Sequence, residues 1–291
     1  MSEKQKPPGL LQRIFRGLYF RFWSRRNATE GNVHLGADSA HLKKIPFTKD
    51  RAFLRPSTSD VGRVGEYTAG IYYSKNYLHA ALLDAQPSVL IDIGANIGLS
   101  SLSLVKEFRS IKNVVAIEAE EENYDVLRKN FALWAEEYPD VAFHAVHGVA
   151  TSTATDAVVS TDSLASLTGE NSASGTFRFD VAAPAVGDHG QKTLKAIAIN
   201  ELFEEIAADE RVVVKVDIEG GEEHLLSANT EWVALSTFLT MEVHDRFHPV
   251  MLNSSKNVIR VLFENDFAIV PSEDILHCYN REKLFPVADN T

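Results

Sequence analysis

Two acidic residues and two glycines around position 95 have the types and spacing of a site for an adenosine-bearing ligand. Residues 89–98 read Val-Leu-Ile-Asp-Ile-Gly-Ala-Asn-Ile-Gly, so an apolar run reaches Asp92 and then turns through Gly94 and Gly98. In parallel α/β proteins such a turn leads from a strand into a helix whose N-terminus faces a nucleotide, and Gly98 would let that helix pack closely. Glu118 closes a second apolar run 20 residues after Gly98. A carboxylate there can accept hydrogen bonds from both hydroxyls of a ribose.

The residue between the two glycines decides which cofactor fits. A dinucleotide-binding turn has a third glycine where this chain has Asn96, so that the backbone can approach a pyrophosphate. Asp92 would attract an ammonium group and repel a phosphate. S-Adenosylmethionine carries a ribose and an ammonium group but no phosphate, and we therefore predict that it is the cofactor. Gly94, Ala95 and Asn96 would pass under its methionine part, with the Asn96 amide donating to the carboxylate.

A second group of acidic residues lies farther along the chain, in two segments. The first reads Lys215-Val216-Asp217-Ile218-Glu219-Gly220-Gly221-Glu222, and the second reads Glu242-Val243-His244-Asp245. With the turn at 92–98, they resemble the FkbM family of S-adenosylmethionine-dependent methyltransferases, over about residues 60–280. That family usually has a Leu-Asp turn before its fourth core strand, where this chain reads Ile199-Asn200-Glu201-Leu202.

The resemblance implies both a fold and a reaction. The fold is α/β, a Rossmann-like class I methyltransferase with a mostly parallel seven-stranded sheet flanked by helices, here with an N-terminal helical extension and an inserted β-hairpin. The reaction is methylation, and the family's association with sugar and polyketide hydroxyls implies O-methylation of a small molecule or a glycan. In this fold the adenine ring lies after the third strand, which implies contact with Gly148 and Val149.

The second group of acidic residues would face the methyl acceptor. Methyl transfer is an in-line displacement, so it needs alignment of the reactants and removal of the proton of a hydroxyl acceptor. His244 is the first choice of general base because imidazole titrates near neutral pH, and Asp217 is the second. The other acceptor-side candidates are Glu219, Glu222, Glu242 and Asp245. Alternatively, a divalent cation that holds a diol acceptor is bound by Asp217, Glu219, Glu242, His244 and Asp245.

Apolar periodicity predicts the elements that position these residues. Helices are expected within 62–84, after Gly98, after Glu118, near 201–207, at 221–229 and near 253–265. Strands are expected at 89–93, 113–118, 141–146, 211–217, 236–243, 268–270 and 275–279. This alternation is typical of a parallel sheet with right-handed crossovers. Two stretches near 157–161 and 175–182 predict the inserted β-hairpin, and the loop around 167–174 either covers the acceptor or is disordered.

The N-terminal region differs in charge from the rest of the chain. We divide the chain into residues 1–60, a basic amphipathic helix and a linker, and residues 61–291, the methyltransferase domain. Residues 1–26 hold seven basic side chains and one acidic one, and apolar side chains recur at helical spacing within 10–26. Such a helix either makes peripheral contact with an anionic membrane or packs on the domain or on a partner subunit. Arginines interrupt its apolar runs, so it is neither a membrane span nor a secretory signal.

Composition and net charge argue against several classes of function. The chain has 291 residues and a formal net charge of −11, which argues against a nucleic-acid partner. Its single cysteine, Cys278, excludes an internal disulfide and is compatible with a cytoplasmic protein, and no Cys/His cluster has metal-ligand spacing. Two other functions remain open: an NAD-dependent oxidoreductase, which Asn96 disfavours, and a non-catalytic cofactor-binding or assembly module, which the second group of acidic residues disfavours.

Overall fold

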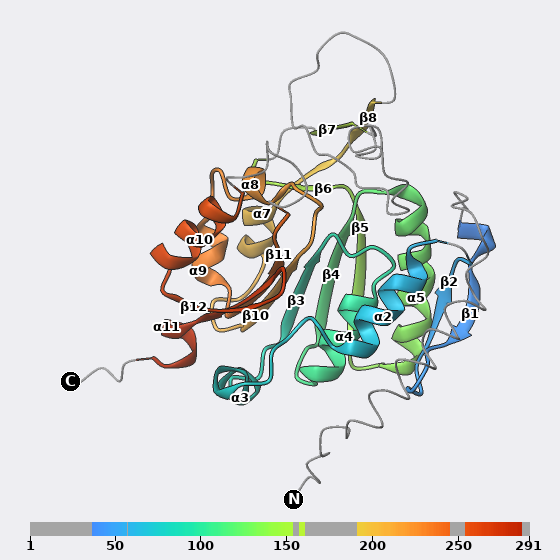
Figure 1. The fold of residues 1–291 in the computed structure, drawn as a ribbon, viewed down its shortest axis with the longest axis horizontal. Helices are drawn as coiled ribbons and strands as arrows, with labels where there is room; N and C mark the ends of the chain where they lie inside the picture. The colour runs from blue at the N-terminus through green and yellow to red at the C-terminus, as the bar shows by residue number, and fades with distance from the viewer. Residues whose placement is uncertain (1–36, 57, 154–156, 161–190, 245–253, 287–291) are drawn as a thin grey trace, which may run out of the picture.

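The computed structural model describes residues 37–56, 58–153, 157–160, 191–244 and 254–286. Its centre is a seven-stranded sheet with the strand order β12-β13-β11-β10-β3-β4-β5 (Figure 1). Its strands are β3 (Val89–Ile93), β4 (Asn113–Glu118), β5 (Ala142–His147), β10 (Val212–Val216), β11 (Phe238–Glu242), β12 (Phe267–Ser272) and β13 (Ile275–Asn280). β13 runs antiparallel to both of its neighbours, and the other neighbouring pairs are parallel. The predicted mostly parallel, seven-stranded α/β fold is confirmed.

Helices cover the sheet in two groups, each with its own apolar cluster. Alternate residues of a strand point to opposite faces, so Leu90 joins one cluster while Ile91 joins the other. The first cluster includes side chains of α2 (Asp60–Ala69), α3 (Tyr77–Asp84), α4 (Leu99–Glu107) and α5 (Glu121–Glu137). The second includes side chains of α7 (Ile199–Glu204), α8 (Glu222–Leu225), α9 (Glu231–Leu235) and α10 (Ser254–Glu264). All five residues of β3 and of β10 are buried, as expected of central strands covered on both faces.

The strand order reverses between β3 and β10. From β3 the chain proceeds through β4 to β5 on one side, while β10 and β11 lie on the other. The register places Asp92 opposite Lys215 and Ile93 opposite Val216, so both strands end at the same level. A reversal of this kind opens a crevice at the carboxyl ends of the strands, which is where ligands bind in open α/β sheets.

Part of the predicted linker has regular structure, which corrects our interpretation of residues 27–60. A short 3-10 helix, η1 (Ala37–Ser39), precedes an antiparallel pair, β1 (His41–Lys44) and β2 (Arg51–Leu54). The pair is attached to α5, since the Asn130 side chain accepts from Phe53 N at 2.6 Å and Trp134 Nε1 donates to Arg51 O at 2.9 Å. We did not predict these strands, because four residues are too few to show a periodic pattern and because α5, on which they pack, is remote in sequence. Within 62–84 we expected one or two helices, and the structure has two, α2 and α3.

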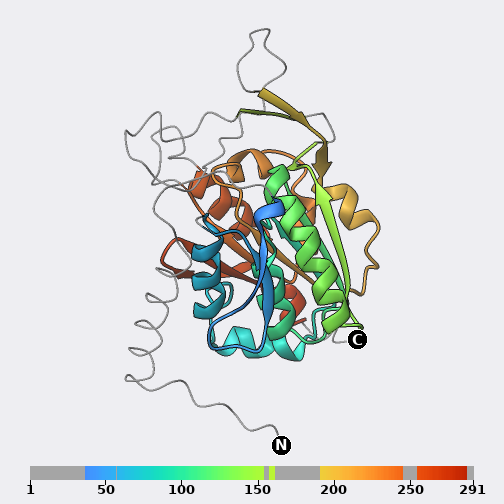
Figure 2. The same ribbon diagram turned by 90° about the vertical axis from the view of Figure 1, so that its right-hand side faces the viewer.

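The insertion after β5 is an antiparallel pair, as predicted, but with a different second strand. β7 (Ala157–Ser160) pairs with β8 (Gln191–Leu194), whereas we expected the partner near 175–182. That stretch and the loop around 167–174 lie outside the described residues. The pair stands beyond the carboxyl ends of the parallel strands, above β6 (Val149–Thr151) and its parallel partner β9 (Ala196–Ala198) (Figure 2). The last element is α11 (Arg281–Leu284).

The basic segment 10–26 also lies outside the described residues, so its contact with a membrane or a partner stays a prediction. Within the described parts of the chain, no helix combines the length and the apolar character that a membrane span requires.

Candidate active site

Close packing of the backbone fixes the glycine turn. Gly94 has a φ of 74°, and a Cβ atom built on it would lie 1.8 Å from the carbonyl oxygen of Asp217. Gly98 has a φ of 88°, and its Cβ would lie 2.7 Å from a methyl carbon of Leu127. Both positions therefore require glycine, because any other side chain would clash and would also strain the backbone. The contact with Asp217 joins the end of β3 to the end of β10, which brings the two predicted halves of the site together.

Glu118 holds the turn from the neighbouring strand. Its Oε2 accepts from the backbone N–H of Asn96 and its Oε1 from that of Glu120, both at 2.8 Å. Burial raises the pKa of the Glu118 carboxyl, although these two hydrogen bonds work against the rise. Each carboxylate oxygen has a further lone pair that a ribose hydroxyl can use. Glu118 thus supports the turn, and its contact with a ribose stays a prediction.

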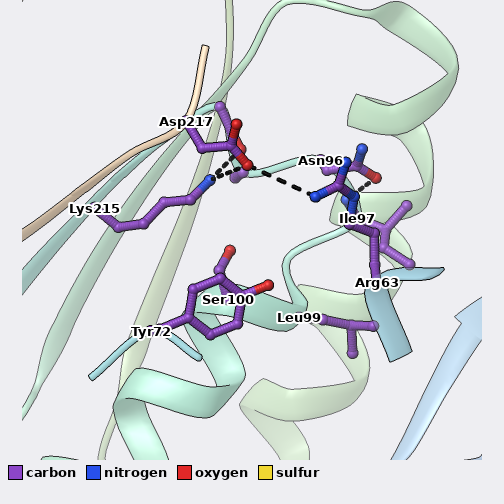
Figure 3. A pocket seen from close by; sticks show the side chains of 10 residues that line it. Arg63, Tyr72, Asn96, Ile97, Leu99, Ser100, Lys215 and Asp217 are labelled. Atoms are coloured by element: carbon purple, nitrogen blue, oxygen red, sulfur yellow. Dashed lines mark hydrogen bonds and ion pairs between the residues drawn. The ribbon is translucent and has the colours of Figure 1, made fainter. Parts of the chain in front are cut away.

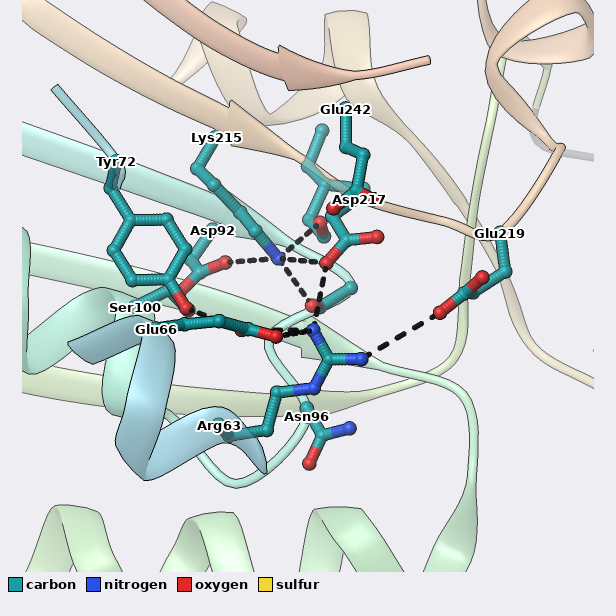
Figure 4. Close-up of polar contacts among 12 residues, drawn as sticks. Arg63, Glu66, Tyr72, Asp92, Asn96, Ser100, Lys215, Asp217, Glu219 and Glu242 are labelled. Carbon is teal, nitrogen blue, oxygen red and sulfur yellow. Dashed lines mark hydrogen bonds and ion pairs between the residues drawn. The ribbon is translucent and has the colours of Figure 1, made fainter. Parts of the chain in front are cut away.

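Asp92 has partners within the chain, which changes its interpretation. Its carboxylate is fully buried, and Oδ2 accepts from the hydroxyls of Ser100 and Ser101 at 2.6 Å each. Its Oδ1 lies 3.4 Å from the Nζ of Lys215, so the ammonium that faces Asp92 in this structure belongs to the protein (Figure 4). A direct contact with the cofactor's ammonium stays a prediction, and it would have to compete with Lys215.

Lys215 connects the two sides of the site. Its Nζ donates to the carbonyl oxygen of Gly94 at 2.5 Å and also lies 3.7 Å from Oδ2 of Asp217. Burial favours the neutral amine, but the carboxylates of Asp92 and Asp217 outweigh this effect and raise the pKa of Lys215. The buried lysine is therefore charged and holds the ends of β3 and β10 together.

Arg63 and Tyr72 reach the site from the segment before β3, and we did not predict either of them. Arg63 of α2 donates to both carboxylate oxygens of Glu66 at 2.9 Å, and it lies 3.7 Å from Oδ2 of Asp217. The Tyr72 hydroxyl donates to Glu66 at 3.0 Å. Both side chains line a pocket beside the glycine turn (Figure 3), together with Gly94, Ala95, Asn96, Ile97, Leu99, Ser100, Lys215 and Asp217. No motif marks Arg63, because its role depends on the packing of α2 against α4.

The predicted acceptor-side residues gather around the imidazole of His244. Its Nδ1 lies 2.8 Å from Oε1 of the fully buried Glu222. Its Nε2 faces three other carboxylates: Asp217 Oδ1 at 3.8 Å, Glu242 Oε1 at 3.7 Å and Glu219 Oε2 at 3.4 Å. Oxygen or nitrogen atoms of Asp217, Glu242 and His244 all lie within 4.8 Å of one another. The remaining candidate, Asp245, lies outside the described residues.

Charge interactions in this cluster separate the pKa values of its members. Burial opposes protonation of His244, but its hydrogen bond to Glu222 and the nearby carboxylates raise its pKa to about 9. Burial and the charge of Asp217 raise the pKa of Glu242 to about 7. Burial would raise the pKa of Asp217 as well, yet Lys215 and Arg63 lower it. A raised pKa favours the imidazolium form of His244 near neutral pH, and its role as general base stays a prediction.

Residues 92–269 of the chain match the family model of the Methyltransferase FkbM domain. The chain belongs to the FkbM methyltransferase family. Solved structures of similar fold include the methyltransferase FkbM from Methylobacillus flagellatus KT, with 14% identity, a TM-score of 0.45, and coverage of 91% of this chain and 59% of that chain. This chain thus spans about 59% of the length of that protein.

A second similar structure is the O-methyltransferase from Bacillus cereus in complex with SAH, with 12% identity, a TM-score of 0.40, and coverage of 75% of this chain and 89% of that chain. A search of curated proteins gives no match.

Two further positions of this FkbM methyltransferase border the site. Gly148 donates its N–H to the carbonyl oxygen of Glu118 at 3.1 Å, and a Cβ on it would lie 2.6 Å from Lys195 O. Val149 is buried and begins β6, where its N–H donates to Lys195 O at 2.9 Å. Both residues follow β5 next to the end of β4, and their contact with an adenine ring stays a prediction.

The sequence departure at 199–202 lies in α7 and serves the packing of helices. The Asn200 side chain donates to Glu231 Oε2 at 2.8 Å and accepts from the Trp232 backbone N–H at 3.2 Å. Asn200 therefore joins α7 to the start of α9. Its contacts within the described residues give it no role beside Asp217 or His244.

Proposed function

We propose that this chain is an S-adenosylmethionine-dependent O-methyltransferase whose acceptor is a hydroxyl group of a small molecule or a glycan. The observation that carries the proposal is the position of two different sets of groups at one sheet edge. The glycine turn and Glu118 suit the adenosine-bearing cofactor, while the carboxylates around His244 suit a polar acceptor. The contact of Gly94 with the Asp217 carbonyl makes the two sets adjacent.

The cofactor would lie across the ends of β3 and β4. Glu118 would accept from the ribose hydroxyls through its unused lone pairs. The Asn96 Oδ1 is held by the N–H of Ile97 at 2.8 Å, so its amide nitrogen is the end that can donate to the methionine carboxylate. Arg63, which lines the pocket beside the glycine turn, would place its guanidinium group near that carboxylate. S-Adenosylmethionine supplies the reactive methyl group when it is bound.

The acceptor hydroxyl would lie on the β10–β11 side, between the glycine turn and His244. The charge on sulfur disappears during transfer, so binding both reactants in line contributes most of the catalysis. The acceptor proton must also leave, and Asp217, Glu242 and His244 interact too closely for any one of them to titrate independently. We therefore assign proton removal to this cluster as a unit, in place of His244 alone.

Cofactor binding is the first test of the proposal. Calorimetry with S-adenosylmethionine and S-adenosylhomocysteine is expected to show one site per chain. Glu118→Gln keeps the shape of the side chain but removes its charge, and it should weaken binding by about 1.5–3 kcal/mol for each charge-assisted hydrogen bond lost. The exposed Glu136 on α5 provides the matched control, Glu136→Gln, which should bind normally. Equal affinity in Glu118→Gln and the wild type would contradict the ribose contact.

Methyl transfer is the second test, because a non-catalytic module would also bind the cofactor. The protein is incubated with cofactor labelled in the methyl group and with a cell extract separated into lipid, glycan, protein and small-molecule fractions. Label recovered as an O-methyl ether in the glycan or small-molecule fraction is the expected result. Binding of a nicotinamide cofactor in place of S-adenosylmethionine, seen by spectroscopic titration, would support an oxidoreductase instead.

A further inference from the structure

We propose that Asp217, Glu242 and His244 bind a divalent cation, and that this cation holds an acceptor with two neighbouring oxygen atoms, such as a vicinal diol. The residues come from the ends of β10 and β11, beside the pocket that is lined by the glycine turn. That the cation holds the acceptor rests on the proposed function. The cation site itself rests on the positions of the three side chains.

The spacing of the three side chains suits a shared ion. His244 Nε2 lies 3.8 Å from Asp217 Oδ1 and 3.7 Å from Glu242 Oε1, and all ligand atoms lie within 4.8 Å of one another. Ligands at bond lengths of ~2.1 Å in an octahedral site are ~3.0 Å apart. The three atoms are thus too far apart for strong hydrogen bonds to one another, and a small inward movement of the side chains would let them coordinate one ion.

Glu222 gives the imidazole the orientation that a metal ligand needs. Its Oε1 lies 2.8 Å from His244 Nδ1, and the Glu222 side chain is fully buried. Glu222 is itself held, since its Oε1 also accepts from the backbone N–H of Gly220 at 3.2 Å. A carboxylate on one ring nitrogen fixes the tautomer, so that the other nitrogen presents its lone pair to a metal. In His244 that other nitrogen is Nε2, which faces Asp217 and Glu242.

Asp217 presents a buried oxygen to the same space. Its Oδ1 is buried and has no hydrogen-bond partner among the described residues. The cationic groups of Lys215 and Arg63 approach the opposite oxygen, Oδ2, each at 3.7 Å. A buried carboxylate oxygen without a donor costs free energy, and a cation between Oδ1, Glu242 and His244 would remove that cost. The positive charges of Lys215 and Arg63 thus lie on the Oδ2 side of Asp217, and a cation at Oδ1 would take the place of the proton on His244.

The ligand set indicates which cation and which acceptor fit. Two carboxylate oxygens with one imidazole nitrogen suit Mn²⁺, since carboxylates favour hard cations such as Mg²⁺ and imidazole favours transition metals. Three protein ligands leave coordination positions that two adjacent oxygens can fill. The cation would lower the pKa of a bound hydroxyl, so the cluster would promote loss of that proton to solvent through the cation, and its three ligands would not accept the proton themselves. The resulting alkoxide forms the new O–CH3 bond, while the S–CH3 bond breaks and its electron pair stays on sulfur as the neutral thioether.

Titration of the full chain with Mn²⁺, without cofactor or acceptor, tests the site. Loss of the electron paramagnetic resonance signal of free Mn²⁺ is expected to saturate at one ion per chain. Electron spin-echo modulation from an imidazole nitrogen should appear in the wild-type complex. Glu242→Gln and Asp217→Asn should each weaken Mn²⁺ binding at least tenfold, and Glu222→Gln should weaken it about 10–100-fold through the orientation of His244. The exposed Glu264 on α10 provides the control, Glu264→Gln, which should bind like the wild type.

The results distinguish this inference from the proposed function. Absence of saturable Mn²⁺ binding in the wild type, absence of nitrogen modulation, or unchanged affinity in Glu242→Gln would each overturn the metal site. Calorimetry with S-adenosylmethionine is run on the same preparations. Cofactor binding without Mn²⁺ binding would overturn this inference and leave the proposed function in place. Mn²⁺ binding without cofactor binding would overturn the proposed function and leave the metal site standing.

Discussion

Buried carboxylates lie on both sides of the glycine turn, but their hydrogen bonds are satisfied in different ways. On the β3–β4 side, Asp92 accepts from two serine hydroxyls, and Glu118 accepts from two backbone N–H groups. On the β10–β11 side, Asp217 and Glu242 face His244 at 3.7–3.8 Å, and Asp217 Oδ1, like Asp92 Oδ1 on the first side, has no hydrogen-bond donor among the described residues. The first side is held mainly by hydrogen bonds from neutral donors, whereas the second side consists mainly of charged groups that face one another at 3.4–3.8 Å.

This difference corresponds to the two tasks of the proposed enzyme. A cofactor that every turnover uses is bound best by groups already fixed by the protein, because little ordering is then lost on binding. The acceptor side must stabilise a charge that develops on the acceptor only during the reaction. His244 Nε2 lies 3.7–3.8 Å from Asp217 and Glu242, so these groups remain able to respond to that charge. Lys215 lies between the two sides and contacts a carboxylate of each.

The largest expected effect separates the two sides by function. Asp217→Asn and His244→Gln should each lower methyl-transfer turnover by roughly 10²–10⁴, because both residues act on the acceptor in the chemical step. Cofactor affinity should remain near that of the wild type, since neither side chain is among the groups proposed to contact the cofactor. Steady-state kinetics and calorimetry on the same preparations check both expectations. If cofactor affinity and turnover fell by the same factor, the two sides of the site would not be functionally separate.

Removing the lysine that joins the two sides should destabilise the fold. Lys215→Met leaves the buried carboxylate of Asp92 without its cation, which should cost about 3–5 kcal/mol of unfolding free energy. Lys129→Met is the control, because Lys129 is 38% exposed and lies 3.8 Å from the exposed Asp38, and it should cost less than about 1 kcal/mol. Urea denaturation measures both. Similar stabilities for the two variants would contradict the connecting role of Lys215.

A change at the glycine turn tests the contact between the sides without changing any charge. Gly94→Ala introduces a Cβ that would lie 1.8 Å from Asp217 O at a φ of 74°, and it should destabilise the protein by about 2–5 kcal/mol. Gly62→Ala in α2 is the control, because its Cβ would meet nothing within 4 Å and alanine favours helix by about 0.5–1 kcal/mol. Thermal unfolding followed by circular dichroism should show a lower melting temperature for Gly94→Ala than for Gly62→Ala. A stable Gly94→Ala variant would mean that β3 and β10 can separate at this point.

Local sequence determined the sheet and the turn. Each core strand contains a short run of apolar residues, and the long helices have apolar periodicity, so the alternation of strands and helices in the core could be predicted. The glycine turn could be predicted because only glycine tolerates the backbone conformation at Gly94 and Gly98. The assembly of acidic residues near His244 followed from the rule that parallel strands end at one edge.

Tertiary packing alone decided which partner each of these residues has. Asp92 faces Lys215, and His244 is held by Glu222, which lies 22 positions earlier. Arg63 reaches Asp217 from a helix before the first core strand, and β2 joins α5 through Asn130. Such pairings depend on how elements remote in sequence pack together. They produce no periodic pattern and no characteristic spacing in the sequence, so they could not be predicted from it. These neighbours raise the pKa of His244, so its usual titration range alone could not decide whether it acts as the base.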